Sequence, residues 1–306
     1  MHSYCDVKIL IFFRAKMKII LFSRPQIDHK AEDLKRLFSL IESFGFDYAI
    51  NEEFAPVVES LLGMNVDAEK IYRQEIETDG VESLLLCLGG DGTLLEGVHR
   101  LADKSVAVAA INFGHLGFLT SATRDDAEEL FRHIAERKLT LQPRTMLEVV
   151  WGEHRQALKA LNEVAVQRLE ATMVKIETRV NSQLVAQYNG DGVIVSTPTG
   201  STAYSLSAGG PVVAPECGCL LLTPLAPHNF GMRPVVLPDS AEISLTINAR
   251  HGRAMLSIDN NTYTIENGTQ IEIRLAKEHI LLAVPHNISF YEALHSKMMW
   301  DVDIRN

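Results

Sequence analysis

The most constraining feature of this sequence is an apolar segment that runs directly into a cluster of glycines. Val81–Leu88 is mostly apolar and is followed by Gly89-Gly90-Asp91-Gly92-Thr93. Apolar residues then recur at three- and four-residue steps from Leu94 to Ala102. This order predicts a strand buried on both faces, a tight loop and a helix. Such a loop directs free backbone N–H groups and the positive end of a helix toward one point, which suits a phosphate.

This glycine loop differs from the two common phosphate-binding motifs. No Gly-Lys-Ser/Thr follows it, so it is not a Walker loop. Leu95 stands where the dinucleotide fingerprint needs a third glycine. Asp91 is the unusual residue, because a carboxylate repels phosphate. Asp91 could accept a proton from an attacking hydroxyl or hold Mg²⁺; for the loop taken alone, a simple turn aspartate is an equally good interpretation.

Strand-like and helix-like segments alternate through the first third of the chain. Buried strands are expected at 18–22, 81–88 and 106–111, and a helix is expected after Asp28, which could cap it. This alternation predicts a parallel sheet in an α/β, Rossmann-like domain. The stretch 51–80 is polar and poorly periodic, and we interpret it as a loop or a weak helix.

After about residue 140 the pattern changes to a period of two. Residues 174–180 alternate between apolar and charged side chains, which predicts a half-exposed antiparallel strand. Similar short runs occur at 146–151, 158–168, 192–196, 243–249 and 271–275. The second region is therefore expected to be β-rich and sandwich-like. Its prolines between 211 and 238 are expected in ordered loops, not in continuous strand.

The length of 306 residues suggests two domains. We expect an N-terminal extension at 1–16, with Met17 as the natural start; a competing interpretation makes 7–13 an edge strand. An α/β domain is expected at 17–122 and a β-rich domain at 123–285. The tail, 286–306, is expected to pack back on the N-terminal domain.

Charge and cysteine usage limit the classes of partner. The formal net charge of −10 argues against nucleic acid or an anionic membrane as the main partner. No apolar run approaches the ~18 residues of a membrane span. Cys87 is expected to be a buried thiol, and the Cys217-Gly218-Cys219 pair has no second pair with which to form a zinc site. A reduced, cytoplasmic protein is expected.

The segment Asp191–Ser207 combines a short strand with a loop that is dense in hydroxyl groups. An apolar strand leads into Ser196-Thr197-Pro198-Thr199-Gly200-Ser201-Thr202-Ala203, and a helix start follows. One helix needs only one or two capping hydroxyls, so the rest indicate a polar ligand. Tyr204 could offer that ligand an apolar face or a hydrogen bond, or could simply pack.

Two further segments carry weaker signals. Asn162-Glu163 is a polar pair within an apolar strand, and one of the two should point inward unless the backbone bulges. Ile111–Leu119 lies at the carboxyl end of a buried strand, where ligands bind in open α/β sheets. Its Phe118 could stack on a base or pack in the core. His115 could titrate near neutral pH, although a lone loop histidine is seldom catalytic.

Together, and in this order, these segments resemble the NAD kinase family. Gly89–Thr93 matches its glycine-aspartate signature, Asn162-Glu163 its Asn-Glu pair, and Asp191–Ser207 its longest signature. Leu222–His228 looks like a further family segment. The resemblance runs from about Met17 to about residue 290. The glycine loop alone is shared with lipid kinases and phosphofructokinases, whereas the hydroxyl-rich segment is specific.

The resemblance implies an enzyme that transfers a phosphoryl group from ATP to the 2′-hydroxyl of the adenosine ribose of NAD, giving NADP. It implies an active site between the two domains, a divalent metal ion (Mg²⁺ is expected) and a homodimer or homotetramer. Asp91 would be the proton acceptor. The NAD site would be lined by Asp91, Gly92, Phe118, Asn162, Glu163, Asp191, Thr199, Thr202, Ala203, Tyr204, Ser207 and Ala226. The donor phosphates would lie on Gly89, Gly90, Gly92 and Thr93; no metal ligand is assigned.

Two departures from the family pattern leave questions open. Glu96 lies where many members carry a basic residue, which puts the phosphate contacts in doubt. Asp259-Asn260-Asn261 stands where the family often has Asp-Gly-Gln, so the role of that turn is open. Two alternative functions are a lipid or sugar kinase, which would not need the hydroxyl-rich loop, and a non-catalytic NAD-sensing module, which could lose Asp91.

Overall fold

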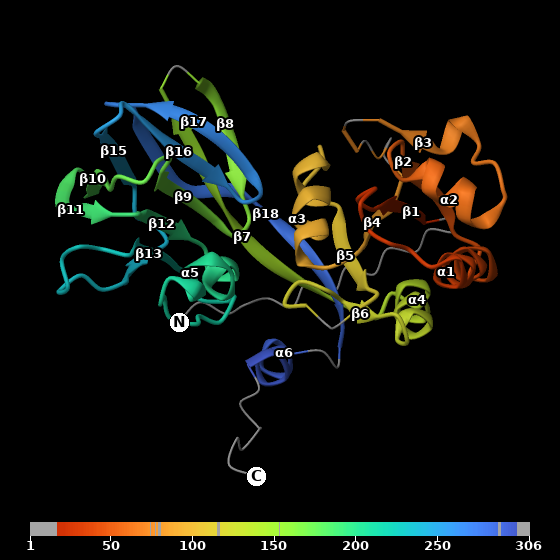
Figure 1. Cartoon of the computed structure of the whole chain (residues 1–306). Helices are drawn as coiled ribbons and strands as arrows, with labels where there is room; N and C mark the ends of the chain where they lie inside the picture. The colour runs from red at the N-terminus through yellow and green to blue at the C-terminus, as the bar shows by residue number, and fades with distance from the viewer. Residues whose placement is uncertain are drawn as a thin grey trace, which may run out of the picture.

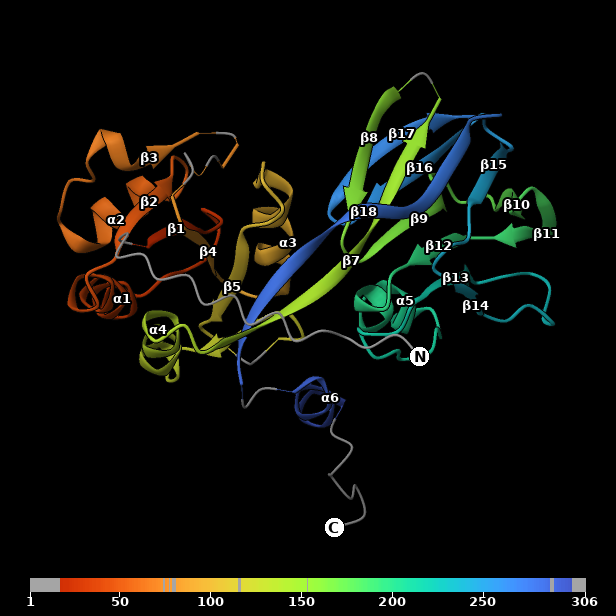
Figure 2. The same cartoon turned by 180° about the vertical axis from the view of Figure 1, so that it is seen from behind.

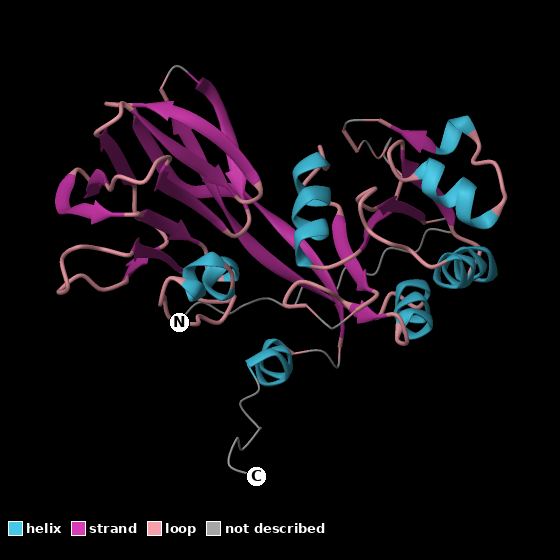
Figure 3. Ribbon diagram, viewed as in Figure 1, coloured by secondary structure: helices cyan, strands magenta, loops and turns pink. Residues whose placement is uncertain are grey.

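The computed structural model describes residues 17–73, 75–76, 78, 81–114, 117–152, 154–286 and 289–298. The expected extension at 1–16 and His115 therefore lie outside the described residues. Figures 1 and 3 show an arrangement of two halves, one with helices around a small parallel sheet and one built almost entirely of strands. Among the described residues, no helix has the length and apolar character to span a bilayer.

The N-terminal half is built on a parallel sheet. Its strands are β1 (Lys18–Phe22), β2 (Asp47–Asn51), β3 (Ile71–Tyr72), β4 (Ser83–Leu88) and β5 (Ala107–Asn112), in the order β5-β4-β1-β2-β3. A two-residue strand, β6 (Ala122–Thr123), pairs with β5. Side chains of β1, β4 and β5 contribute to hydrophobic clusters on both faces of this sheet. The prediction of an α/β, Rossmann-like half is confirmed.

Helices cover both faces of the parallel sheet. One face carries α1 (Ala31–Ser43), α2 (Ala55–Leu62) and α4 (Ala127–Ala135), and a short 3₁₀ turn, η1 (Ala68–Lys70), precedes β3. The other face carries α3 (Asp91–Arg100), which lies between the parallel strands and the second half (Figures 1 and 2). Apolar side chains of α3 share one cluster with Met146, Leu161 and Ile280 from the second half.

Two local expectations need correction here. The helix expected after Asp28 begins only at Ala31, and its N-cap is Lys30 with no side-chain capping bond. The stretch 51–80, interpreted as a loop or a weak helix, also contains the strand β3 and the 3₁₀ turn η1 in addition to a helix, α2. A proline in its first turn and Gly63 in the left-handed conformation at its end bound this helix. These are ordinary start and stop signals for a helix too short to show a clear period.

The C-terminal half consists of two antiparallel layers. One layer is formed by β7 (Leu139–Trp151), β8 (His154–Ala160), β10 (Val174–Val180), β11 (Gln183–Gly190), β15 (Ile243–Ala249) and β18 (Gln270–Pro285). The other is formed by β9 (Glu163–Arg168), β12 (Gly192–Ser196), β13 (Cys219–Leu225), β14 (Val235–Pro238), β16 (Arg253–Ile258) and β17 (Asn261–Glu266). Alternate residues of both layers form one buried core, so the β-rich prediction is confirmed.

The proline-rich region contains strand where only loops were expected. Pro224 lies within β13, opposite Val193 of β12. The other neighbour, β14, pairs only with residues 219–222. Because Pro224 needs no second partner, its missing N–H breaks no ladder bond.

One strand joins the two halves. β18 pairs with β15 near its start, with β7 along most of its length, and with β5 at Leu281 and Leu282. The parallel sheet and one sandwich layer are therefore a single twelve-stranded sheet. The predicted domain boundary at residues 122 and 123 stays a prediction. Three short helices complete the described chain: η2 (Thr199–Thr202), α5 (Tyr204–Ser207) and α6 (Phe290–Met298).

Gly192→Ala should destabilise the sandwich. An added Cβ would overlap the backbone carbonyl oxygen of Val166 on β9, and a backbone atom cannot rotate away. We expect the free energy of unfolding to fall by about 1–3 kcal/mol, as overpacking usually costs. Urea denaturation measures it. Gly114→Ala is the control, because its Cβ would lie 3.6 Å from Asn112, an ordinary contact. Equal midpoints for the two variants would contradict the close approach of β9 and β12.

Candidate active site

The glycine loop lies between the end of β4 and the start of α3, as predicted. Gly89 has a φ of 150°, and an added Cβ would overlap the hydroxyl oxygen of Thr93. Gly90 is the N-cap of α3 and brings no side-chain cap to its first turn. The positive end of α3 therefore stays available to an anion.

A cavity of about 460 Å³ adjoins this loop. It is lined by Arg24, Gln26, Ile27, Gly90, Gly92 and Thr93. The guanidinium of Arg24 donates to the carbonyl oxygen of Gly92 at 2.6 Å and pairs with Glu96 at 2.6 Å. Glu96 also pairs with Arg100 at 3.0 Å. The acidic residue that replaces the expected basic one is thus neutralised, and Arg24 brings a cation to the loop from β1.

Asp91 is the first residue of α3, and its carboxylate is held by the loop after β5. It accepts the backbone N–H of Phe118 at 3.0 Å and that of Leu119 at 3.1 Å. Gly117 lies so close that an added Cβ would overlap the carboxylate. The Nζ of Lys297, on α6, lies 3.7 Å from Oδ2 of Asp91. The carboxylate is therefore oriented by the protein while remaining partly exposed.

Phe118 is half-buried beside Asp91. Its ring centroid lies 6.3 Å from that of Phe290 and 4.9 Å from the Nζ of Lys297. Both contacts come from α6, so this C-terminal helix packs on the N-terminal half at the site. The ammonium group of Lys297 lies over the face of the Phe118 ring, and the ring quadrupole attracts it electrostatically.

Asn162 and Glu163 lie where the chain crosses from one sandwich layer to the other. β8 ends at Ala160 and β9 begins at Glu163. The expectation of a pair within one continuous strand was therefore wrong. The break leaves both residues largely buried, and Oδ1 of Asn162 and Oε2 of Glu163 have no hydrogen-bond partner. Unpaired buried polar atoms are costly, so a ligand is a natural partner for them.

Asp259 fixes this crossing. Its fully buried carboxylate accepts the backbone N–H groups of Leu161 at 2.7 Å, Asn162 at 2.8 Å and Glu163 at 3.0 Å. It also lies 3.0 Å from Nε2 of His99 on α3. The turn whose role the sequence left open therefore has a central structural position: Asp259 matches the first residue of the family's Asp-Gly-Gln, and the departure itself lies at Asn260 and Asn261.

Burial and, next in size, the nearby negative charge of Asp259 together raise the pKa of Glu163 to about 8. A backbone hydrogen bond with Tyr204 acts in the opposite direction. Most Glu163 carboxyl groups are thus neutral at pH 7. A neutral carboxyl donates as well as accepts, which suits a hydroxyl or a base edge.

The hydroxyl-rich loop packs directly on the Asn162 segment. The hydroxyl of Thr197 donates to the carbonyl oxygen of Leu161 at 2.6 Å, and an added Cβ at Gly200 would overlap the carbonyl oxygen of Asn162. The hydroxyl of Thr199 is buried without a partner, as are the Asn162 and Glu163 oxygens. Thr202 donates back to Thr199 at 3.3 Å. Several hydroxyls thus stabilise the loop, while Thr199 is left for a ligand.

The remaining predicted residues surround the start of β12. Asp191 pairs with Arg168 at 2.6 Å, and an added Cβ at Gly190 would lie 2.6 Å from the carbonyl oxygen of Ala226. Ala226 has a φ of 38°, which is strained for alanine and typical of functional turns.

Tyr204 is exposed at the start of α5 and donates to Gln167 at 3.2 Å. Partial burial, followed by the charges of Asp191 and Glu163, raises the pKa of its phenol. Ala203 lies between η2 and α5, and Ser207 is exposed at the end of α5.

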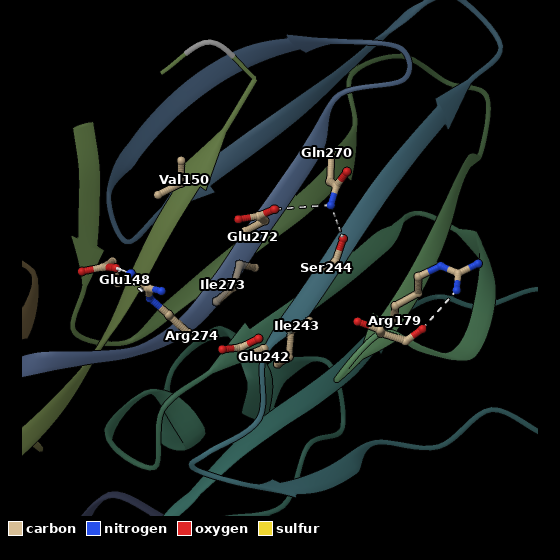
Figure 4. Close-up of a pocket in the computed structure, with 11 residues that line it drawn as sticks. Glu148, Val150, Arg179, Glu242, Ile243, Ser244, Gln270, Glu272, Ile273 and Arg274 are labelled. Carbon is tan, nitrogen blue, oxygen red and sulfur yellow. Dashed lines mark hydrogen bonds and ion pairs between the residues drawn. The ribbon is translucent and has the colours of Figure 1, made fainter. Parts of the chain in front are cut away.

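A second cavity, of about 360 Å³, lies away from all of these residues (Figure 4). It lies on the outer face of the twelve-stranded sheet, where Arg274 pairs with Glu148 and the amide of Gln270 donates to Ser244 at 3.1 Å. Among its charged lining residues, Arg274 and Glu148 pair with each other across two strands. None of the predicted site residues lines it, so the candidate site is the region between the halves.

Comparisons with known proteins agree with this geometry. The description "ATP-NAD kinase N-terminal domain" matches residues 19–139, and "ATP-NAD kinase C-terminal domain" matches residues 161–284. The chain belongs to the NAD kinase family. As a member of this family, it is a phosphotransferase with NAD kinase activity.

Relatives of similar length support the assignment. The NAD kinase of Bacteroides fragilis is 34% identical over 292 residues, which cover 94% of this chain and 100% of that protein. The NAD kinase of Christiangramia forsetii is 34% identical over 298 residues, covering 95% and 100%.

Two solved structures share the fold. Yeast NADH kinase complexed with NADH has a TM-score of 0.82 at 22% identity, covering 95% of this chain and 90% of that one. An NAD kinase from Archaeoglobus fulgidus in complex with ATP has a TM-score of 0.69 at 23% identity, covering 93% and 98%.

Three residues of this NAD kinase site were missed from the sequence. Arg24 could have been found, because it follows β1, and neighbouring parallel strands β1 and β4 end at the same edge of the sheet. For Asp259, the resemblance of its turn to the family's Asp-Gly-Gln was the only signal, and it left the role of the turn open; Lys297 carried no usable local signal. Their roles depend on contacts with residues far away in the sequence.

Glu163→Gln should remove a pH dependence of stability. The folded-state pKa of Glu163 is about 8 against an ordinary 4.5. The stabilisation from the protonated form is therefore complete below pH 4.5 and is lost as pH rises through about 8. Between pH 6 and 9, we expect the wild-type free energy of unfolding to fall, relative to Glu163→Gln, by on the order of 1–2 kcal/mol. Parallel curves would show that Glu163 is ionised; solvent-facing Glu177→Gln is the control.

Proposed function

We propose that this chain transfers the γ-phosphoryl group of ATP to the 2′-hydroxyl of the adenosine ribose of NAD, giving NADP and ADP. The observation that carries this proposal is the Asp91 carboxylate, oriented by two backbone N–H groups at the open end of α3. The glycine loop directly precedes α3, and the C-terminal half, which carries the unpaired polar atoms of Asn162, Glu163 and Thr199, packs against this helix. Phosphoryl transfer needs positioning and charge neutralisation more than covalent chemistry.

On the donor side, the glycine loop would bind the phosphates of ATP. Backbone N–H groups at Gly90 to Thr93 and the positive end of α3 would contact phosphate oxygens. Arg24 lines the same cavity and would add a cation. Since its guanidinium is already held by Gly92 and Glu96, Arg24 is preorganised for that contact.

On the acceptor side, NAD would be held by the C-terminal half. Asn162, Glu163 and Thr199 offer buried polar atoms without partners, and Asp191 and Tyr204 lie on adjoining segments. Gly92, Phe118, Thr202, Ala203, Ser207 and Ala226 would complete the NAD site. This arrangement would leave the ribose hydroxyl facing Asp91.

In the reaction, the 2′-oxygen of the ribose attacks the γ-phosphorus, and the bond from that phosphorus to ADP breaks. The hydroxyl proton passes to Asp91. A carboxylate is a weak base for an alcohol, but in a loose transition state the proton can leave late, so a positioned acceptor is sufficient.

A divalent metal ion, Mg²⁺ in our proposal, would enter with the donor. Among the described residues, no group of three or more His, Cys, Asp or Glu side chains could hold a metal. Mg²⁺ commonly binds through phosphate oxygens and one or two carboxylates, so Asp91 is the side chain that fits. When bound, the metal would neutralise phosphate charge. We further propose a cytoplasmic location and a homodimer or homotetramer, both supported by the family resemblance.

Asp91→Asn should reduce kcat by roughly 10²–10⁴-fold, because the ribose proton loses its acceptor. The KM for NAD should change little, since the asparagine oxygen still accepts one of the two loop N–H groups and no proposed NAD-binding side chain other than Asp91 is altered. NADP formed from NAD, ATP and Mg²⁺ is measured with an NADP-specific dehydrogenase. Exposed Asp103→Asn is the control. Unchanged turnover would make Asp91 structural; wild-type protein that binds NAD but forms no NADP would favour the sensing module.

Lys297→Met should lower kcat about tenfold or more, because a cation beside the reacting groups stabilises charge that develops in the transition state. Lys297→Arg should retain most of the activity. The same assay measures both variants, with Lys175→Met on β10 as the control. A methionine variant that works at the wild-type rate would show that the contact between Lys297 and Asp91 only anchors α6.

A further inference from the structure

The turn between β16 and β17 has an unusual conformation and an unusual set of contacts. Asp259 has a φ of 47°, a left-handed conformation that aspartate tolerates better than most residues. Its side chain is fully buried. Beyond the three bonds that its carboxylate accepts, its own N–H donates to the carbonyl oxygen of Glu163 at 3.0 Å. The turn and the crossing between sandwich layers are thus tied in both directions.

The same turn reaches α3 at two points. Nε2 of His99, in the last turn of the helix, lies 3.0 Å from Oδ2 of Asp259. Nδ2 of Asn260 donates to the carbonyl oxygen of Gly92, in the first turn, at 3.3 Å. Positions seven apart lie on one face of a helix, about 10 Å from each other along its axis. The turn therefore braces one face of α3 near both ends.

These contacts connect the two sides of the active site. Asp91 begins α3, so any rotation or slide of the helix moves its carboxylate. Asn162 and Glu163 present the buried polar atoms on the acceptor side. Asp259 holds the backbone of that pair and, through His99, the helix of Asp91. This one short turn thus sets the position of Asp91, the proposed proton acceptor, relative to Asn162 and Glu163, the proposed NAD-binding residues.

A purely stabilising role would not need a charge here. A second carboxyl, Glu163, lies close enough that the charge of Asp259 contributes to its raised pKa. Placing a buried carboxylate beside another carboxyl costs stability unless its hydrogen bonds compensate. The carboxylate of Asp259 makes four hydrogen-bonding contacts. Three are with backbone N–H groups of the segment 161–163, which presents the polar atoms proposed to bind NAD, and one is with His99 on the helix that begins with Asp91.

We propose that Asp259, with Asn260 and His99, is a positioning unit for phosphoryl transfer: it keeps the Asn162–Glu163 segment and the Asp91 helix in register. This inference rests on the proposed function, because it assigns how the acceptor hydroxyl is kept in line with Asp91. A misplacement of about 1 Å between reacting groups can cost a hundredfold in rate. The unit therefore acts on kcat, through geometry, without touching the reacting atoms.

The test uses His99→Ala, Asn260→Gly and Asp259→Asn in the full chain. His99→Ala and Asn260→Gly each remove one contact with α3 and leave the three backbone bonds to Asp259 intact, so they remain informative if Asp259→Asn does not fold. Steady-state kinetics at 25 °C give kcat and the KM values for NAD and ATP, and thermal unfolding gives Tm. The controls are His251→Ala and Asn261→Ala, on exposed residues of the same hairpin region.

We expect His99→Ala to lower kcat about three- to thirtyfold and Asn260→Gly about two- to tenfold, with smaller changes in KM. His99→Ala should have a smaller further effect in the Asp259→Asn background than in wild type, because Asp259→Asn already weakens the contact that His99→Ala removes. That non-additivity is a readout that a general loss of stability does not produce.

A Tm that falls in the variants while kcat and KM stay within twofold of wild type would overturn the positioning role. Fully multiplicative losses in the double variant would overturn it as well. If wild-type protein forms no NADP, the proposed function itself fails and the inference fails with it. Active wild type with unaffected variants refutes the inference alone.

Discussion

The carboxyl group of Asp259 is removed from water, and four hydrogen-bonding contacts replace its hydration. Such a group tolerates little displacement, since losing one contact leaves a buried charge poorly compensated. The crossing from β8 to β9, the end of α3 and the β16–β17 turn are therefore constrained by one another. The glycine loop directly precedes α3, and the hydroxyl-rich loop packs on the crossing from β8 to β9. The positions of both loops therefore depend on the contacts of this one carboxylate.

What could be predicted from the sequence depended on local pattern. The parallel strands showed as apolar runs and the sandwich strands as alternation, because burial on two faces or one face leaves those periods. The glycine loop was recognised by its glycines between an apolar run and a helical pattern. The hydroxyl-rich loop was recognised because it has more hydroxyl groups than helix capping requires. Each of these signals lies within about fifteen residues of chain, and the corresponding elements were placed correctly.

The incorrect predictions concern residues whose local structure depends on tertiary contacts. Asn162-Glu163 was expected within a strand, because nothing local shows that the chain changes layers there. Pro224 was expected in a loop, because its tolerance depends on where β14 stops pairing. Arg24, Asp259 and Lys297 become part of the site only through contacts with distant segments. From the sequence, Glu96 put the phosphate contacts in doubt because it replaces a basic residue. In the structure, Arg24 pairs with Glu96 and brings a cation to the same place.

An acidic protein that handles two polyanionic substrates must concentrate its positive potential locally. In the candidate site, helix-terminal N–H groups and two cations, Arg24 and Lys297, would supply this potential, and each cation is held beside a carboxylate. Paired cations do not attract anions over long distances, since the fields of the partners cancel. Recognition is therefore short-range: phosphates would be favoured once they enter the loop, while a formal net charge of −10 disfavours nucleic acid as a partner.

β18 is the last strand of the described chain, yet it pairs with β5 on the side away from β4. The two strands pair at Ala107 with Leu281 and at Val108 with Leu282. During synthesis, the N-terminal half therefore leaves the ribosome with this edge of its sheet open until the C-terminal strand arrives. Open strand edges template aggregation, and such distant pairing forms slowly. Separating the two family domains would therefore remove β18 from β5 and leave hydrogen-bonding groups of the parallel sheet exposed.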